Sequence, residues 1–128
     1  MQLQQYFSEK AGIGVISTSN KNGEVNSAVY AKPHVMDKNT VAFIMRDKRT
    51  RANLHENSKA SYLFTEHDHG FKGVRLYLTM TRENQDREVI EALSRRASKD
   101  TGDMDRFLVS FSVDKARALI GDDEFELQ

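Results

Sequence analysis

The chain has 128 residues, no cysteine and a net charge of zero, because 19 lysines and arginines balance 19 aspartates and glutamates. This composition excludes a disulfide-built secreted domain, a cysteine–zinc site and thiol catalysis. It also argues against an extended nucleic-acid interface, which needs a basic excess, and against an integral membrane protein, since 30% of the residues are charged and mean hydropathy is −0.64. We expect one cytoplasmic domain over residues 1–128, with no targeting segment and no nucleic-acid or membrane partner.

The first third of the chain predicts one short helix and three strands. Apolar residues recur at helical spacing over residues 3–10. Three strands follow, at residues 13–18, 25–31 and 41–45. The dipeptide Asn22-Gly23 between the first two predicts a type I′ hairpin turn, because both central positions of that turn need positive φ.

The remaining chain alternates helices and strands. Helices are predicted at residues 49–57, at 85–99 with Asn84 as N-cap, and at 114–120. Strands are predicted at residues 60–65, 74–81 and 107–113. The acidic residues 122–128 are expected to fray. Antiparallel hairpins dominate this order, which favours a mainly β (α+β) fold: a six-stranded antiparallel barrel with helices at its side and ends.

Residues 46–54 are the most informative segment for function. Four of the first six residues are basic, and they lie where a strand ends and a helix begins. Free N–H groups and the positive end of the helix dipole meet there, which makes an anion site. Arg49 offers a planar fork suited to phosphate, and the Asn53 amide lies one turn further along. The residues alone leave open a solvated helix start that is merely basic.

Other chemistry is poorly supported by the sequence. There is no Gly-x-Ser-x-Gly elbow, no Walker pattern and no nucleophile beside a base, so no catalytic side chain is assigned. The triplet His67-Asp68-His69 supplies too few ligands by itself, and we expect no metal site.

Three stretches carry a resemblance to a known family. They are Val25-Asn26-Ser27-Ala28, the strand Val41-Ala42-Phe43-Ile44-Met45, and the segment Lys48-Arg49-Thr50-Arg51-Ala52-Asn53-Leu54-His55-Glu56-Asn57. Their order and spacing resemble the FMN-binding split-barrel superfamily, the pyridoxamine 5′-phosphate oxidase-like proteins. In size the chain is similar to the small FMN-binding proteins of that superfamily, and the match covers roughly residues 14–113 as one FMN-binding split-barrel domain.

The resemblance implies a set of cofactor contacts. Asn26, Ser27 and Ala28 would touch the flavin ring or the ribityl chain. Phe43 and Ile44 would line the cofactor, and Arg75 would be the polar residue that points at the flavin. Four residues would hold the phosphate: Lys48, Arg49, Thr50 and Asn53. The family binds FMN in a groove between two subunits, so the resemblance also implies a homodimer, with residues 74–81 and part of 60–65 near its interface.

The implied function is that of an FMN-dependent oxidoreductase, reduced by NAD(P)H or another small-molecule donor. The alternative is an FMN-binding electron carrier or storage module without its own substrate. A true pyridoxamine 5′-phosphate oxidase is not expected, because the family's C-terminal Arg and His that grip the substrate have no equivalent here. Ser58 also stands where the family often has proline. Deazaflavin F420 or haem, which other members bind, stay open as cofactors.

Overall fold

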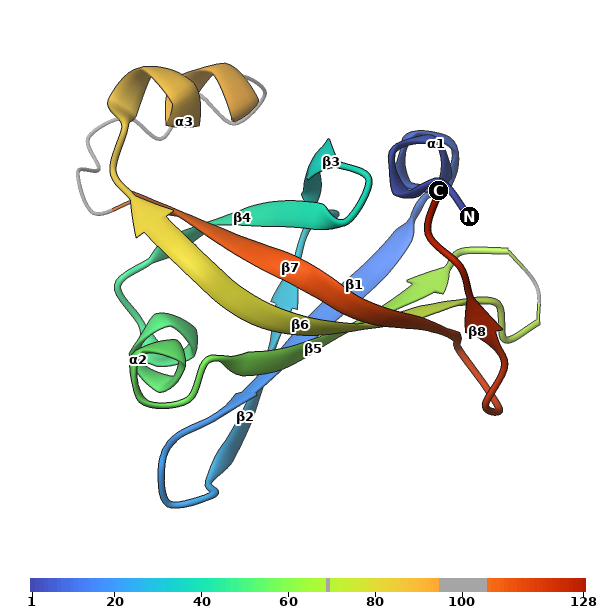
Figure 1. The fold of residues 1–128 in the computed structure, drawn as a ribbon, viewed down its shortest axis with the longest axis horizontal. Helices are drawn as coiled ribbons and strands as arrows, with labels where there is room; N and C mark the ends of the chain where they lie inside the picture. The colour runs from blue at the N-terminus through green and yellow to red at the C-terminus, as the bar shows by residue number, and fades with distance from the viewer. Residues whose placement is uncertain (69, 95–105) are drawn as a thin grey trace.

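The fold is built mainly from antiparallel strands, with helices at their ends (Figure 1). The computed structural model describes residues 1–68, 70–94 and 106–128. Within these residues the elements are α1 (Leu3–Glu9), β1 (Gly12–Ser19), β2 (Val25–Tyr30), β3 (His34–Asp37), β4 (Thr40–Arg46), α2 (Arg49–Glu56), β5 (Lys59–Glu66), β6 (Gly73–Asn84), α3 (Arg87–Leu93), β7 (Arg106–Ala118) and β8 (Glu124–Phe125).

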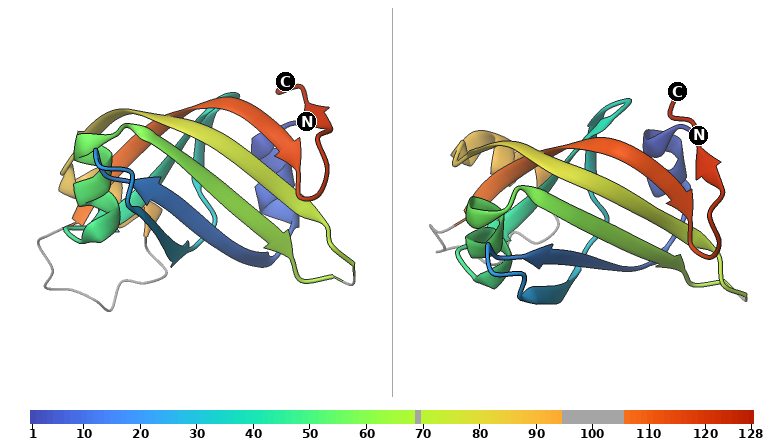
Figure 2. Two further views of the ribbon diagram at one scale, coloured as in Figure 1. Left: turned by 90° about the horizontal axis from the view of Figure 1, so that it is seen from below. Right: turned by 60° about the horizontal axis from the view of Figure 1, so that its bottom comes forward.

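One curled sheet contains all the strands of the described residues, in the order β2-β1-β5-β6-β7-β4-β3 with β8 paired to β7 (Figure 2). Every pairing is antiparallel. The two ends of the order, β2 and β3, leave the sheet open rather than closed. The predicted antiparallel split-barrel class is therefore confirmed. The predicted count of six strands is wrong, because β3 and β8 also pair and the sheet has eight strands.

The hairpin between β1 and β2 forms where the sequence predicts it, but with a wider turn. Gly23 has a positive φ of 83°, whereas none of the described non-glycine residues does, so the type I′ turn is not formed. The Asn20 amide donates to the Glu24 carbonyl at 3.0 Å, and the Asn20 side-chain oxygen accepts from the backbone amides of Asn22 and Glu24. This side chain takes the place of a tight turn.

Aromatic side chains fill the core between α1 and the inner face of the sheet. Phe7 of α1 packs edge-on against Phe64, with 5.3 Å between ring centroids. Phe43 lies 5.0 Å from Tyr62 and 5.9 Å from Phe111. All five rings are buried, which fits the alternation of inward and outward residues along each strand.

The last predicted helix, residues 114–120, is wrong. β7 continues through Ala118, pairing with β6 on one side and with β8 on the other. The tail that was expected to fray is also held: the Gln128 amide donates to the Met1 carbonyl at 2.9 Å, and the Met1 ammonium donates to the Glu126 carbonyl at 2.6 Å. Tertiary pairing thus decides the conformation of both segments.

α3 covers a small second cluster of buried residues, in which Ile90 packs with Ala42 and Leu108. Its N-cap is Asp86, whose carboxylate accepts from the Val89 amide, rather than the predicted Asn84. Residues 95–99 of the predicted helix lie outside the described residues. Across residues 1–68, 70–94 and 106–128, no helix is long and apolar enough to span a membrane.

Candidate functional site: the start of helix α2

α2 begins three residues after β4 ends, at the same end of the sheet as the β1–β2 hairpin (Figure 1). Its buried residues are Thr50, Asn53 and Leu54, which share one helical face and pack toward β1 and β2. The helix runs over Arg49–Glu56, close to the predicted 49–57, and Leu54 points inward as expected. This packing fixes which residues α2 presents to solvent.

The N-terminus of α2 is basic and uncapped. Lys48 occupies the N-cap position in extended conformation, no side chain caps the helix there, and its first turn contains no acidic residue. Lys48 and Arg49 are exposed, and within the described part of the chain neither side chain has a hydrogen-bond or ion-pair partner. Ser, Thr, Asp or Asn would normally accept from the first N–H groups, so this end lacks its usual acceptor. The arrangement suits a bound anion.

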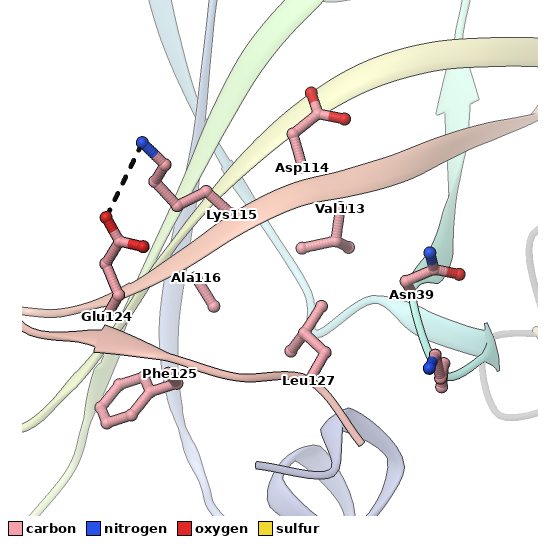
Figure 3. A pocket seen from close by; sticks show the side chains of 9 residues that line it. Asn39, Val113, Asp114, Lys115, Ala116, Glu124, Phe125 and Leu127 are labelled. Carbon is pink, nitrogen blue, oxygen red and sulfur yellow. Dashed lines mark ion pairs between the residues drawn. The ribbon is translucent and has the colours of Figure 1, made fainter.

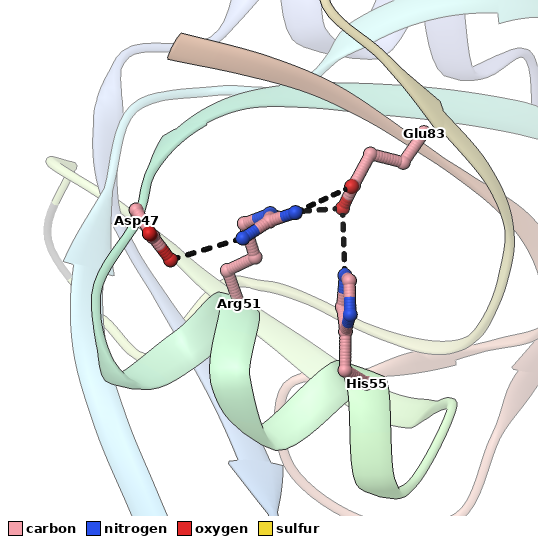
Figure 4. A network of polar contacts seen from close by, with 4 residues as sticks. All are labelled: Asp47, Arg51, His55 and Glu83. Atoms are coloured by element: carbon pink, nitrogen blue, oxygen red, sulfur yellow. Dashed lines mark hydrogen bonds and ion pairs between the residues drawn. The ribbon is translucent and has the colours of Figure 1, made fainter. Parts of the chain in front are cut away.

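Arg51, the fourth basic residue of the segment, is already neutralised (Figure 4). Its guanidinium donates to both Glu83 carboxylate oxygens, at 3.0 and 2.7 Å, and to Asp47 at 2.9 Å. It also lies 3.6 Å from the centre of the Phe107 ring. His55 Nε2 lies 3.0 Å from the same Glu83 carboxylate. These contacts raise the pKa of Arg51 and, through Arg51 first, lower the pKa of Glu83. Arg51 therefore links α2 to β6, and its guanidinium is not available to bind an anion.

The buried face of α2 is held to β1 by a neutral hydrogen bond. The Asn53 amide donates to the Thr18 hydroxyl of β1 at 3.1 Å. The Thr50 side chain also turns inward, near Tyr30, and burial raises the pKa of the Tyr30 phenol more than the Thr50 hydroxyl lowers it. Thr50 and Asn53 are only 4% and 3% exposed, so both side chains are turned toward the protein.

The predicted residues of β2 divide between the two faces of the strand. Asn26 pairs with Thr18 across the β1–β2 ladder, which brings it beside the Asn53 anchor. Ala28 packs on the core. Ser27 points to the outer face, where its hydroxyl lies 2.9 Å from that of Ser17. Asn26 is thus the β2 residue that the structure places with α2.

Phe43 and Ile44 of β4 also lie on opposite faces. Phe43 is 2% exposed, and its ring centroid lies 5.8 Å from that of Tyr30. Ile44 packs against the cluster of Ala42, Ile90 and Leu108 beneath α3. Of these two residues, Phe43 is the one that packs against Tyr30, which lies near Thr50 of α2.

Arg75 is not brought to the start of α2. It lies near the beginning of β6, whereas the α2 contact at Glu83 lies near the end of that strand. Its guanidinium donates to the carbonyls of Ala118 at 2.9 Å and of Gly121. Arg75 therefore stabilises the turn between β7 and β8.

The comparison with protein families decides what kind of domain this is. The profile of the family described as pyridoxamine 5′-phosphate oxidase matches residues 2–123. The chain belongs to this family. Its match leaves out only Met1 and the last five residues, so among the described elements it includes α2 and every strand of the sheet except β8.

Solved structures with this fold are similar over nearly the whole chain. HupZ of Group A Streptococcus has a TM-score of 0.75 at 17% identity, covering 97% of this chain and 96% of its own. An FMN-binding protein from Syntrophomonas wolfei has a TM-score of 0.75 at 21% identity, covering 94% and 85%. General Stress Protein 26 from Bacillus anthracis has a TM-score of 0.74 at 13% identity, covering 98% and 95%. At these identities the likeness shows the pyridoxamine 5′-phosphate oxidase-like fold alone. No curated protein matches the chain.

A cleft of about 290 Å³ lies elsewhere in this pyridoxamine 5′-phosphate oxidase-family domain, between β7 and the C-terminal segment (Figure 3). Val113, Ala116 and Leu127 form part of its wall, and Lys115 pairs with Glu124 across it at 3.8 Å. None of the predicted site residues lines it. Of the triplet His67-Asp68-His69, which was considered as a metal site, His69 lies outside the described residues.

Two residues of the α2 site were missed by the sequence analysis. The inward position of Thr18 could have been predicted from the sequence, because Gly14, Ile16 and Thr18 alternate with outward residues and so share the inner face. The contact of Glu83 with Arg51 could not have been predicted from local spacing, since the two residues are 32 positions apart in the chain.

Proposed function

We propose that this chain binds FMN, with the flavin phosphate at the N-terminus of α2. The observation that carries the proposal is the exposed, uncapped helix start, where Lys48 and Arg49 have no partner among the described residues. A phosphate would accept from the N–H groups of the first turn and pair with both side chains. Membership of the pyridoxamine 5′-phosphate oxidase family and the FMN-binding structural neighbour support the choice of FMN.

We infer that the protein is an FMN-dependent oxidoreductase. Bound FMN would supply hydride or single-electron transfer, and the chain would bind and orient it. Asn26, beside the Thr18–Asn53 pair, would lie along the cofactor from β2. The alternative, an FMN-binding electron carrier or storage module, is distinguished by turnover. Oxidation of NADH or NADPH by the FMN-loaded protein, well above the rate with FMN alone, would favour the oxidoreductase.

A homodimer with FMN at its interface is part of the proposal. The outer face of the sheet carries an apolar row in which Val29, Val15 and Leu63 are neighbours on β2, β1 and β5. Val29 is 75% exposed and Leu63 39%, and Ile13 beside them is 49% exposed. A two-fold axis would bury such a row against its own copy. Light scattering should give a dimer mass for the wild type and a monomer mass for V29E/L63E. The control V89E changes an exposed valine on α3 and should stay dimeric.

The FMN proposal is tested by titrating the purified, flavin-free protein with FMN and following flavin fluorescence. The double variant K48A/R49A should bind FMN on the order of a hundredfold more weakly, because two charge-assisted contacts are removed. The control K38A/K72A removes two exposed lysines that lie outside α2 and should bind like the wild type.

Two results would contradict the proposal. A wild type that takes up no FMN would refute the function, and equal FMN affinity in wild type and K48A/R49A would refute the placement of the phosphate. The same titration with F420 and with haem tests the choice of cofactor. Tighter binding of either than of FMN would replace FMN in the proposal.

A further inference from the structure

We propose that Thr18 is a positioning residue for the phosphate end of the FMN site. It holds Asn53, and through Asn53 the rotation of α2, so that Lys48, Arg49 and the first-turn N–H groups face the phosphate. In this assignment Asn53 and Thr50 anchor the helix and do not contact the anion. The inference rests on the proposed FMN function and adds a residue and a division of roles to it.

The Thr18–Asn53 hydrogen bond is the buried link between α2 and the sheet. Its 3.1 Å distance joins two side chains that are each 3% exposed. Neither group can exchange its partner for bulk water, so losing one leaves the other unsatisfied at a cost larger than that of an exposed hydrogen bond. Asn53 lies one turn after Thr50, and both side chains point inward. Their common direction fixes the rotation of the helix about its axis.

The opposite side of α2 is fixed by a different kind of contact. Arg51 and His55, four residues apart on one face, both reach Glu83 of β6 (Figure 4). α2 is therefore held from β1 by a neutral buried hydrogen bond and from β6 by a charged pair. A rotation of the helix by one residue would break both links.

This double anchoring leaves few groups for an anion. Thr50 and Asn53, at 4% and 3% exposure, are turned into the protein, and Asn53 could reach an anion outside the helix only by leaving the Thr18 hydroxyl. Arg51 already binds two carboxylates. The exposed side chains at the helix start are Lys48 and Arg49. Because their direction depends on the rotation of α2, the hydroxyl of Thr18 sets the geometry of a site that it does not touch.

The test compares FMN with riboflavin, which has the same ring and ribityl chain but no phosphate. In T18V, the Asn53 amide loses its acceptor while the side-chain shape is kept. We expect FMN affinity to fall about tenfold, equivalent to about 1.4 kcal/mol, and riboflavin affinity to change less than about twofold. T18S keeps the hydroxyl and should retain FMN affinity.

The control is T81V, which removes the hydroxyl of Thr81 that donates to the Ser110 carbonyl at 3.2 Å. It removes a threonine hydroxyl hydrogen bond away from α2 and should leave the FMN-to-riboflavin affinity ratio unchanged. If T18V does not fold, T18A removes the same hydroxyl in a smaller side chain and takes its place in the comparison.

The outcomes separate the two proposals. A wild type that binds neither flavin refutes the proposed function and this inference with it. If the wild type binds FMN, an unchanged FMN-to-riboflavin ratio in T18V refutes the positioning role alone, whether both affinities are kept or both fall together. A ratio that falls in T18V and recovers in T18S supports it.

Discussion

The Tyr62 hydroxyl occupies the space that a side chain on Gly14 would fill. The two residues lie on the paired strands β5 and β1, and the hydroxyl donates to the Ala31 carbonyl at 3.0 Å. Tyr62 is fully buried, so this hydrogen bond satisfies a polar group that water does not reach. Burial also raises the pKa of the phenol, which stays protonated. A glycine at residue 14 is what lets the ring lie there.

We therefore expect G14A to destabilise the protein by about 1–3 kcal/mol, the usual cost of overpacking a core. The measurement is the free energy of unfolding from urea titration. Because the added methyl group meets the Tyr62 ring, G14A/Y62L should lose less stability than the sum of G14A and Y62L. S17A, on the outer face of the same strand, is the control. Additive losses would show that the two residues do not compete for space.

Lys32 links the segment after β2 to the end of α1. Its ammonium donates to the carbonyls of Phe7 at 2.8 Å and Lys10 at 2.9 Å, which the helix leaves without partners. K32M keeps the aliphatic stem and removes these bonds. We expect a loss of about 1 kcal/mol and faster amide hydrogen exchange in α1. K38M removes an exposed lysine elsewhere and should change neither. Unaltered exchange in α1 would contradict the capping role.

The end of β7 shows why part of the fold could not be predicted locally. The residues 114–120 include good helix formers, and their sequence favours a helix when taken alone. In the structure Ala116 is buried, and its neighbours Lys115 and Arg117 point outward. This strand-like alternation is short, and in the sequence one small apolar residue is its only sign. The partners that impose it, Leu76 and Phe125, come from other strands.

The candidate site divides in the same way. The start of α2, its inward Leu54 and its basic first turn follow from local spacing, and the structure has them as predicted. Whether each basic side chain is available to a ligand depends on residues that are distant in the sequence. Arg51 is neutralised by Glu83 of β6, and Arg75 is bound to the carbonyls of Ala118 and Gly121. The local sequence shows which residues of a segment are charged. It does not show which distant residues pair with those charges or accept hydrogen bonds from them.

Glu83 should make the protein more stable at neutral pH than in acid. Its pKa lies below the ordinary value of 4.5, chiefly because Arg51 binds the carboxylate. A carboxyl whose pKa is lowered by folding contributes fully above the unfolded-state value and loses that contribution as the pH falls through the folded value. We expect E83Q to cost about 1–2 kcal/mol at pH 7.

The acid limb provides the check on Glu83. The difference in unfolding free energy between wild type and E83Q should shrink as the pH is lowered below about 4.5, the ordinary value of this carboxyl. D123N removes an exposed carboxylate and should follow the wild type at each pH. A difference that stays constant from pH 7 to pH 3 would mean that the Arg51 contact does not depend on the charge of Glu83.

His34 should produce a second pH dependence, nearer neutrality. It begins β3, pairs with Ala42 and is half-buried, and burial lowers its pKa from the ordinary 6.5. As the pH falls below about 6.5, the unfolded chain takes up a proton on this ring before the folded protein does, so the wild type loses stability. H34Q cannot titrate there and should show a flatter profile of unfolding free energy between pH 7.5 and pH 5. H67Q, which removes an exposed histidine, should keep the wild-type slope. Equal slopes in wild type and H34Q would show that burial of this ring does not set its proton affinity.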